Sequence, residues 1–290
     1  MVINELLLEG RKRLSDGADA SGALETEVLL AHVLGCSREE LLRDGVSREV
    51  DSSDEALFFK YVDEVAEGKP VAYITGLKEF YGMDFYVDER VLVPRPETEM
   101  VVDEVLDWLG GNQARFVENR EAKMLDIGTG SLNITAAIVR HFGHVYAHAV
   151  DVSEDALEVA RMNREAHGLE THVELYESDL LSNVDEKRFD VIVANLPYLA
   201  ENVLKFEPSC ALFGGSDGLE LYKKLIQQIS DKKLGFDLMV WEFGFGQAPA
   251  MREMLSKFFD QGFCGRKYEW ELKNDLSGVP RIFVVKRIDV

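Results

Sequence analysis

The chain has 290 residues, 46% of them hydrophobic, and a formal net charge of −21 from 32 basic and 53 acidic residues. This length and composition predict a folded protein of one large or two modest domains with a sizeable core. The acidic balance argues against direct binding of nucleic acid, which needs a basic surface to neutralise phosphates. No window is long and apolar enough to span a bilayer, and Glu5 and Glu9 stand where a signal peptide carries basic residues, so we expect a cytoplasmic protein. We also expect a monomer.

Cysteine and histidine spacing predicts neither a disulfide framework nor a metal site. The three cysteines lie far apart and form no Cys-x-x-Cys pair: Cys36, Cys210 and Cys264. Three histidines run from an expected helix end into an expected strand and need not share a face: His141, His144 and His148. We therefore expect buried or idle thiols and histidines with packing or surface roles.

The first 68 residues are predicted to form a small helical domain. Amphipathic helices are expected between residues 3 and 67, with breaks at 16–17, 34–37 and 44–45. Ser37 and Glu40 have the spacing of a capping box for the next helix. One apolar face is expected from residues at helical spacing, which are Leu24, Val28, Ala31 and Leu34. Residues 1–70 carry 8 basic and 16 acidic side chains, a net charge of −8, which is unsuited to gripping RNA.

Residues 69–93 are predicted to form a β-hairpin linker. Lys69-Pro70 marks a break, after which residues 71–74 and 83–87 alternate as strands do, with Gly76 and Gly82 between them. A helix is then expected after Pro96, because Glu97 and Glu99 fall in its first turn, where the helix dipole favours acidic side chains.

From residue 94 to residue 290 we expect one α/β domain, because strands and helices alternate from Ala122 onward. Such alternation predicts a mostly parallel sheet with helices on both faces. The expected strands are 123–127, 145–150, 172–176, 189–194, 237–241, 267–272 and 281–286, and the expected helices are 133–141, 154–167, 219–229 and 249–259.

A glycine loop after the first of these strands predicts a nucleotide-like ligand. Gly128 and Gly130 allow the backbone to turn tightly and approach a ligand, and Asp151 ends the next strand at the spacing of a ribose-binding carboxylate. Asn133 replaces the third glycine of the dinucleotide fingerprint, so NAD fits poorly. Asp126 suits a cofactor with positive groups and no phosphate, such as S-adenosylmethionine; ordering the loop or capping the helix is its alternative role.

Two further segments end strands of the expected sheet. Asp179 and Leu180 follow the third strand, where an adenine edge would lie. The alternative is that the Ser-Asp pair only forms a turn, as this pair often does in loops. Asn195-Leu196-Pro197-Tyr198 follow the fourth strand. An amide or exocyclic amine is a poor nucleophile because its lone pair is delocalised, and an Asn oxygen beside a backbone carbonyl can orient it. The tetrapeptide therefore indicates methyl transfer to a planar nitrogen, with a strand-ending turn as the alternative.

Several segments along the chain carry a family pattern. They are Pro70-x-x-Tyr73-Ile74-x-Gly76, Phe80-x-Gly82, Val93-Pro94-Arg95-Pro96-Glu97-Thr98-Glu99, Asp126-x-Gly128-Thr129-Gly130-Ser131, Asp151-Val152-Ser153, Ala160-Arg161-x-Asn163, Glu207-Pro208, Ala211 to Gly215, Asp217-Gly218-Leu219 and Glu242-x-Gly244 with Gln247. On these segments the chain resembles the PrmC/HemK family of release factor glutamine methyltransferases over nearly its whole length. The stretch from Arg95 to Glu99 is the most specific, since other amino-methyltransferases lack it.

The resemblance implies a class I, Rossmann-like methyltransferase domain that uses S-adenosylmethionine and releases S-adenosylhomocysteine, with the helical domain recognising a peptide-chain release factor. The implied substrate is the glutamine of a Gly-Gly-Gln loop, whose amide would be held by Asn195, Leu196, Pro197 and Tyr198. The cofactor would lie against Asp126, Gly128, Thr129, Gly130, Ser131, Leu132, Asp151, Asp179, Leu180 and Asn195. Arg95, Pro96 and Glu97 would form the floor of the site, with ion pairing at the helix start as the alternative for Arg95 and Glu97.

Two positions depart from the family pattern. Leu196 replaces the first proline of Asn-Pro-Pro-Tyr, which removes a locked φ but keeps the carbonyl. Leu132 replaces a glycine and is expected to narrow the loop near the cofactor. Asn-Leu-Pro-Tyr also resembles the signature of ribosomal RNA adenine dimethyltransferases, so methylation of adenine in RNA or DNA is the rival activity. A cofactor-binding module without catalysis is the rival outside enzymes.

Overall fold

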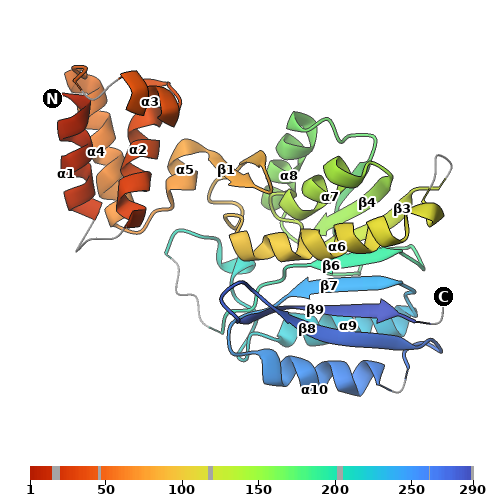
Figure 1. Cartoon of the computed structure of the whole chain (residues 1–290). Coiled ribbons are helices and arrows are strands. Elements are labelled where there is room, and N and C mark those ends of the chain that lie inside the picture. Colours follow the sequence, from red (N-terminus) through yellow and green to blue (C-terminus); the bar gives the residue numbers. More distant parts are fainter. Residues whose placement is uncertain (15–19, 45–46, 117–119, 201–204, 261, 289–290) are drawn as a thin grey trace. The chain divides into compact units, whose positions relative to one another are not determined.

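A computed structural model describes residues 1–14, 20–44, 47–116, 120–200, 205–260 and 262–288 (Figure 1). These residues form two compact units, one of residues 1–77 with 205 and 206, the other of the remaining described residues. None of the helices in the described ranges is long and apolar enough to cross a membrane.

The first unit is helical, as expected. Its helices are α1 (Ile3–Leu14), α2 (Ala20–Leu34), α3 (Arg38–Asp44), α4 (Ser52–Ala66) and α5 (Val71–Thr75). The capping box at the start of α3 is confirmed, because the Ser37 N–H donates to Glu40 at 2.8 Å and the Glu40 N–H donates to Ser37 Oγ at 3.1 Å. The expected breaks at 16–17 and at Gly45 lie outside the described residues.

One expectation for this region is right in part and one is wrong. On α2, Ala31 of the predicted apolar face is buried and Leu34 packs against the core, but Leu24 is exposed. Leu29 and Leu30, which were not predicted, are fully buried. Residues 71–74, predicted as a strand, form the single turn α5, because Pro70 precedes it in extended conformation and Gly76, at φ +71°, ends it in the left-handed conformation. The hairpin exists, but its strands are β1 (Leu77–Phe80) and β2 (Met83–Tyr86).

The second unit is the α/β domain that the sequence predicts. Its helices are η1 (Pro96–Thr98), α6 (Glu99–Gly111), η2 (Gln113–Arg115), α7 (Asn133–Phe142), α8 (Glu154–Ala166), η3 (Ser209–Ala211), α9 (Glu220–Lys232) and α10 (Ala248–Phe259). Its sheet strands are β3 (Ala122–Ile127), β4 (Val145–Asp151), β5 (Val173–Glu177), β6 (Val191–Ala194), β7 (Leu238–Glu242), β8 (Tyr268–Asn274) and β9 (Pro280–Arg287).

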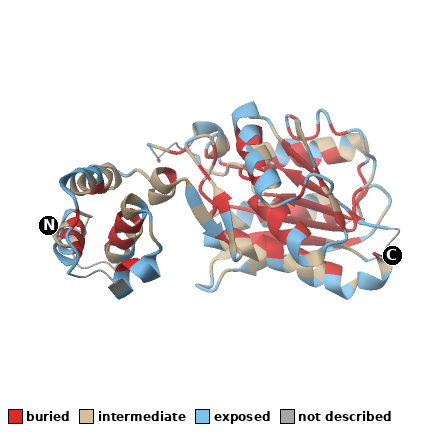
Figure 2. Cartoon of the chain, turned by 90° about the horizontal axis from the view of Figure 1, so that it is seen from above, coloured by how far each residue is buried: buried red, intermediate tan, exposed pale blue. Residues whose placement is uncertain are grey.

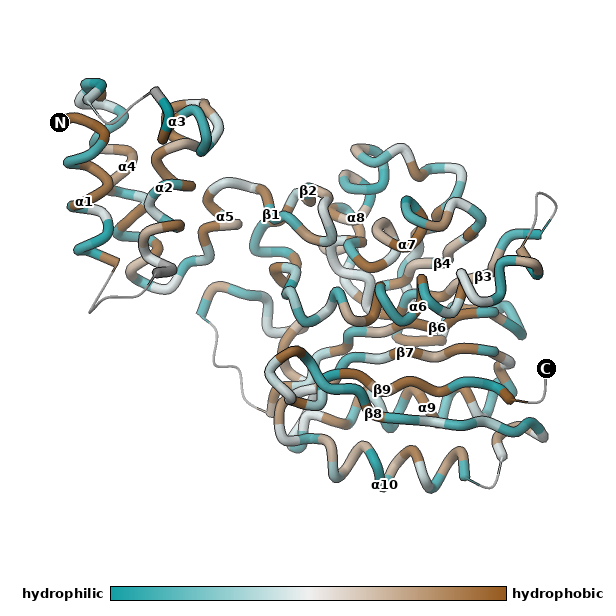
Figure 3. The backbone as a smooth tube through the Cα atoms, in the orientation of Figure 1, coloured by the Kyte–Doolittle hydropathy of each residue, from teal (hydrophilic) through white to brown (hydrophobic). Residues whose placement is uncertain are grey.

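The seven-stranded sheet has the order β5-β4-β3-β6-β7-β9-β8. The first five strands in this order are parallel, and β9 and β8 join antiparallel at one edge. Helices α6, α7 and α8 contribute to the core on one face, and α9 and α10 to the core on the other. Figure 2 shows burial concentrated along the strands, and Figure 3 shows apolar stretches in β7 and β9 beside a mostly hydrophilic β8. This agrees with a parallel centre covered by helices on both faces.

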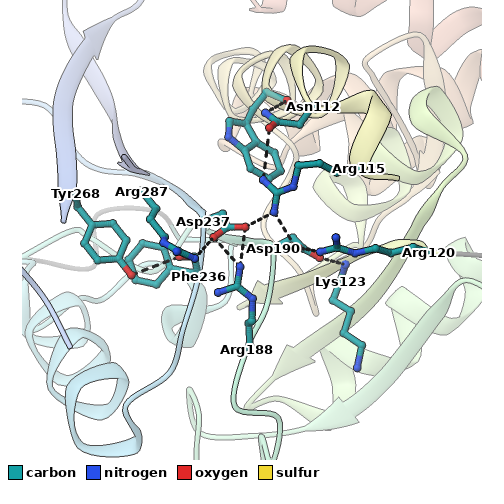
Figure 4. A network of polar contacts seen from close by, with 11 residues as sticks. Asn112, Arg115, Arg120, Lys123, Arg188, Asp190, Phe236, Asp237, Tyr268 and Arg287 are labelled. Atoms are coloured by element: carbon teal, nitrogen blue, oxygen red, sulfur yellow. Dashed lines mark hydrogen bonds and ion pairs between the residues drawn. The ribbon is translucent and has the colours of Figure 1, made fainter. Parts of the chain in front are cut away.

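A cluster of charged side chains holds the amino-terminal ends of the central strands together (Figure 4). Asp237, directly before β7, is 1% exposed and accepts from Arg115 at 2.5 Å, Arg188 at 2.7 Å and Arg287 at 3.2 Å. Burial alone would raise the pKa of Asp237, but the hydrogen bonds from Arg115 and Arg188 outweigh it and hold that pKa below its ordinary value. The network therefore ties together four separate stretches of chain at the edge of the sheet opposite the glycine loop.

Candidate functional site

The register of the sheet brings the predicted site residues to one edge. Ile127 of β3 pairs with Val150 of β4 and with Ala194 of β6, and Ala194 pairs with Trp241 of β7. Because these four strands are parallel, the residues that follow the paired positions emerge together at their carboxyl ends. They are Gly128, Asp151, Asn195 and Glu242.

A cavity with about 970 Å³ of empty space, including its part open to solvent, lies at this edge. Apolar and small residues dominate its lining, with few charged groups among them. The lining comprises Arg90, Val91, Leu92, Pro94, Arg95, Thr98, Ile127 to Ser131, Asn133, Ile134, Asp151 to Ser153, Ala156, Ser178 to Leu180, Asn195 to Pro197, Cys210, Ala211 and Leu221. Its mostly apolar lining with a few polar groups suits a small organic ligand.

The glycine loop has the conformation that its sequence requires. Gly128 and Gly130 have φ of +75° and +53°, in the left-handed region that favours glycine. A Cβ atom on Gly128 would lie 3.1 Å from Cδ2 of Leu196, whereas a Cβ on Gly130 would meet nothing within 4 Å. Gly130 therefore leaves open space at the cavity. Thr129 and Ser131 also line the cavity.

Asp151 connects this loop to the end of β4. Its Oδ2 accepts from the Gly130 N–H at 3.0 Å and its Oδ1 accepts from the Ser153 N–H at 3.0 Å. Burial raises the pKa of Asp151 even though these backbone groups favour its charged form. Each oxygen keeps acceptor capacity at the cavity wall, so the carboxylate is placed to accept hydroxyl donors from a ligand.

Asp126 occupies a different place from the one predicted. It is fully buried and does not line the cavity. Its Oδ2 accepts from Thr129 Oγ1 at 2.8 Å and Thr135 Oγ1 at 2.7 Å, and its Oδ1 has no hydrogen-bond partner among the described residues. Burial raises the pKa of Asp126 to about 6, against these two hydroxyl donors. We therefore assign Asp126 to ordering the loop, which was its alternative role, and not to direct contact with a ligand.

Leu132, which was expected to narrow the loop near the cofactor, is also outside the cavity lining. It precedes α7 with φ +70° and ψ +9°, a left-handed conformation that costs a non-glycine residue free energy. Its side chain is fully buried among the apolar residues of α7 and the sheet. Leu132 thus adopts a backbone conformation that favours glycine and directs its side chain into the core.

Asp179 and Leu180 lie at the cavity, at the end of β5. The Asp179 carboxylate forms an ion pair with Lys224 at 2.6 Å and is half exposed. Leu180 has φ +54° and is buried against the cavity wall. The Ser178 hydroxyl donates to the Leu180 carbonyl at 2.8 Å, which holds this loop in place.

Asn195 is held by two side chains that the sequence analysis gave no role. Its Nδ2 donates to Glu242 Oε2 at 3.0 Å and lies 3.2 Å from Thr98 Oγ1. Thr98 Oγ1 in turn donates to the same Glu242 oxygen at 2.6 Å. Within the described residues no hydrogen bond uses Asn195 Oδ1, and Asn195 lines the cavity. The amide oxygen is therefore available to a ligand.

The rest of the tetrapeptide is divided between the cavity and the core. Leu196 and Pro197 line the cavity, whereas Tyr198 does not. The Tyr198 hydroxyl donates to Glu242 Oε1 at 3.2 Å, and burial, with the nearby Glu242 charge, raises the pKa of Tyr198. The Tyr222 hydroxyl lies 3.2 Å from the Leu196 carbonyl oxygen and closer to that of Glu242. Since a phenol has one proton, the Leu196 carbonyl retains acceptor capacity.

Only one of the three predicted floor residues lines the cavity. Arg95 does so, and its guanidinium pairs at 2.5 Å with buried Glu207, a partner distant in sequence and not at the helix start. Pro96 is exposed and Glu97 is half buried, and neither lines the cavity.

Glu242 is a candidate functional residue that the sequence placed in the family pattern without giving it a role. It ends β7, is 2% exposed, and burial raises its pKa to about 7 although Thr98 and Tyr198 donate to it. A signal was present, because an acidic residue directly follows the apolar run Leu238 to Trp241 at the end of a predicted parallel strand. Its partners Thr98 and Asn195 are far away in sequence, which no local pattern reveals.

The described residues contain no group of three His, Cys, Asp or Glu side chains arranged to hold a metal ion. Of the cysteines, Cys210 and Cys264 are exposed and Cys36 is partly buried, and Cys210 borders the cavity.

Comparison with known proteins gives family matches in two parts of the chain. Residues 5–76 match the PrmC N-terminal domain, and residues 113–216 match the methyltransferase small domain. Proteins described as release factor glutamine methyltransferase are similar over most of their length. The one from Koribacter versatilis is 35% identical, with 99% of each chain covered, and the one from Rhodopirellula baltica is 35% identical, with 92% of this chain and 90% of the relative covered.

Solved structures support the fold. A human methyltransferase 10 domain containing protein has a TM-score of 0.51 at 17% identity, covering 71% of this chain and 90% of that one. The hMettl16 catalytic domain in complex with MAT2A 3'UTR hairpin 1 has a TM-score of 0.54 at 15% identity, covering 84% of each chain. The Rossmann-like methyltransferase fold expected from the sequence is thereby confirmed.

Proposed function

Because the chain belongs to the release factor glutamine methyltransferase family, we propose that it transfers a methyl group to the side-chain amide nitrogen of the glutamine in a Gly-Gly-Gln loop of a peptide-chain release factor. The observation that carries this proposal is the Asn195 amide. Its Nδ2 faces Glu242 and Thr98, and its oxygen has no hydrogen-bond partner among the described residues at the cavity.

The cavity residues fit S-adenosylmethionine as the methyl donor. That molecule supplies a methyl group on a positively charged sulfur when bound. Asp151 would accept from its ribose hydroxyls, and Leu180 would cover its adenine. The absence of a side chain on Gly130 leaves space for a ligand at this point of the cavity. The Asp151 carboxylate is desolvated and has no charged partner among the described residues, so it suits a ligand with hydroxyl donors.

The proposed chemistry is one of orientation. Asn195 Oδ1 and the Leu196 carbonyl would accept the two N–H bonds of the substrate amide and fix its nitrogen in line with the methyl group. Holding two reactants in this way is worth up to ~7–11 kcal/mol of the barrier in ideal cases, without a general base. Water can accept the proton after transfer. Tyr198 supports this geometry through its bond to Glu242.

We propose three parts of the chain: a helical domain at 1–68, a hairpin linker at 69–93 and a methyltransferase domain at 94–290. The helical domain is proposed to recognise the release factor. The net charge of −8 over residues 1–70 suits a basic protein partner, since the loop-bearing domain of a release factor faces ribosomal RNA. The same charge disfavours adenine in RNA or DNA as the substrate. We propose a monomer that acts in the cytoplasm.

The test is transfer of labelled methyl from S-adenosylmethionine to a purified release factor. The matched controls are the release factor with its loop glutamine changed to alanine, and unmodified ribosomal RNA. Label on the unchanged factor alone is the expected result. Label on RNA, or equal label on the alanine variant, would contradict the proposed substrate.

A further inference from the structure

Glu242 does not line the cavity, yet its carboxylate contacts the polar groups behind the tetrapeptide. We infer that Glu242 is a positioning residue that fixes the orientation of the Asn195 side-chain amide, so that Oδ1 and not Nδ2 faces the substrate. The inference rests on the proposed function for its consequence in catalysis. The contact itself exists independently of any substrate.

The geometry is a closed triangle of three side chains. Glu242 Oε2 accepts from Thr98 Oγ1 at 2.6 Å and from Asn195 Nδ2 at 3.0 Å, and Asn195 Nδ2 also lies 3.2 Å from Thr98 Oγ1. Thr98 ends η1 and directly precedes α6, Asn195 follows β6, and Glu242 ends β7. Three separate elements of the fold therefore set these positions. The other oxygen of Glu242 is occupied by the Tyr198 hydroxyl.

The charge state of Glu242 decides which end of the amide faces it. An ionised carboxylate only accepts hydrogen bonds, so an amide turned by 180° would place two acceptor oxygens against each other and lose a buried hydrogen bond. A neutral carboxyl group has one O–H and can donate to the oxygen of the turned amide. Protonation of Glu242 therefore removes the preference for the productive orientation.

Several titratable groups act on Glu242 from the elements around it. Glu97 raises its pKa, Arg281 of β9 lowers it, and the hydroxyls of Tyr198 and Tyr222 are near. Burial is the largest influence and brings the pKa to about 7. The productive orientation should thus be gained as the pH rises through about 7.

The experiment compares full-length wild type with Glu242→Gln, Thr98→Val and the control Glu271→Gln, which changes a half-exposed glutamate on β8 of the same sheet. The readouts are kcat and KM for release factor between pH 6 and pH 8, and the Kd of S-adenosylmethionine. For wild type the rate should rise between pH 6 and pH 8 with a midpoint near pH 7, by about twofold, because a neutral Glu242 leaves the two amide orientations equally populated. The control should match wild type.

For Glu242→Gln we expect kcat at pH 8 to fall about twofold and to lose its pH dependence, because the neutral amide accepts either orientation of Asn195, with the cofactor Kd unchanged. Thr98→Val removes a donor that lowers the pKa of Glu242, so its rising limb should move to higher pH. A Glu242→Gln enzyme that keeps the wild-type rate or the wild-type limb would overturn the inference. So would a Thr98→Val limb that stays in place or moves to lower pH.

A measurement without substrate separates this inference from the proposed function. The side-chain amide signals of Asn195, assigned by NMR with Asn195→Ala, should shift with a midpoint near pH 7 in wild type and stay constant in Glu242→Gln. Signals that ignore pH in wild type would overturn the inference, whatever the substrate. Absence of methyl transfer by wild type at every pH would instead reject the proposed function, and the NMR titration would then decide the inference alone.

Discussion

Replacing Leu132 separates two opposing contributions to stability at the start of α7. The residue is fully buried but sits at φ +70°, where its Cβ is strained. A left-handed backbone favours glycine, so the backbone conformation alone predicts that Leu132→Gly is harmless or stabilising. The structure predicts the reverse, because the side chain is part of the core.

The magnitudes follow from burial and backbone conformation. Truncating a fully buried leucine to alanine costs about 2–5 kcal/mol, and alanine keeps the left-handed strain. Glycine removes about 1–2 kcal/mol of that strain but adds about 0.4–1 kcal/mol of flexibility to the unfolded chain. Leu132→Gly should therefore be about 1 kcal/mol more stable than Leu132→Ala, and both should be less stable than wild type.

The assay is urea unfolding of the three proteins, with the cofactor Kd measured beside it. Stability should fall in the order wild type, Leu132→Gly, Leu132→Ala, and cofactor affinity should change little because Leu132 is not a lining residue. A Leu132→Gly protein as stable as wild type would refute the assigned core packing. An alanine variant more stable than the glycine variant would refute the assigned backbone strain.

Two further predictions concern other parts of the second unit. Asp237→Ala should lower the free energy of unfolding by about 3–5 kcal/mol in urea titrations, because three arginines lose their buried carboxylate partner. A loss below about 1 kcal/mol would contradict a stabilising role for the charged network in Figure 4. Alkylation of Cys210 should be slowed severalfold by S-adenosylmethionine while exposed Cys264 reacts unchanged, as followed by peptide mass spectrometry. Equal Cys210 rates with and without cofactor would contradict binding in the cavity.

The sheet was largely predictable from the sequence because its central strands are apolar runs bounded by glycine or acidic residues. Residues 71–74 show where that reasoning fails. Val71 and Ile74 favour a strand by their β-branched side chains, but Pro70 and Gly76 set backbone angles that start and stop one helical turn. In such a short segment the flanking residues outweigh the propensity of the interior.

The candidate site was predictable where its residues follow strands, as Gly128, Asp151 and Asn195 do. The structure brings these three to one edge through the strand register. Asp126 and Leu132 were predicted to contact the cofactor, and the structure places both in the interior, outside the cavity lining. Sequence proximity to the loop does not say which side of the backbone a side chain takes. Glu242 acquires its meaning only from partners that the fold brings to it from Thr98 and Asn195.

The central claim is that Asn195 orients a glutamine amide for methylation. The most direct measurement is tandem mass spectrometry of release factor after reaction with wild type or Asn195→Ala, with the cofactor Kd of each enzyme determined in parallel. The account predicts N-methylglutamine in the Gly-Gly-Gln loop with wild type, and a rate about 10²–10³-fold lower with Asn195→Ala at unchanged cofactor affinity. Methylation of another residue, or an Asn195→Ala enzyme as fast as wild type, would contradict it.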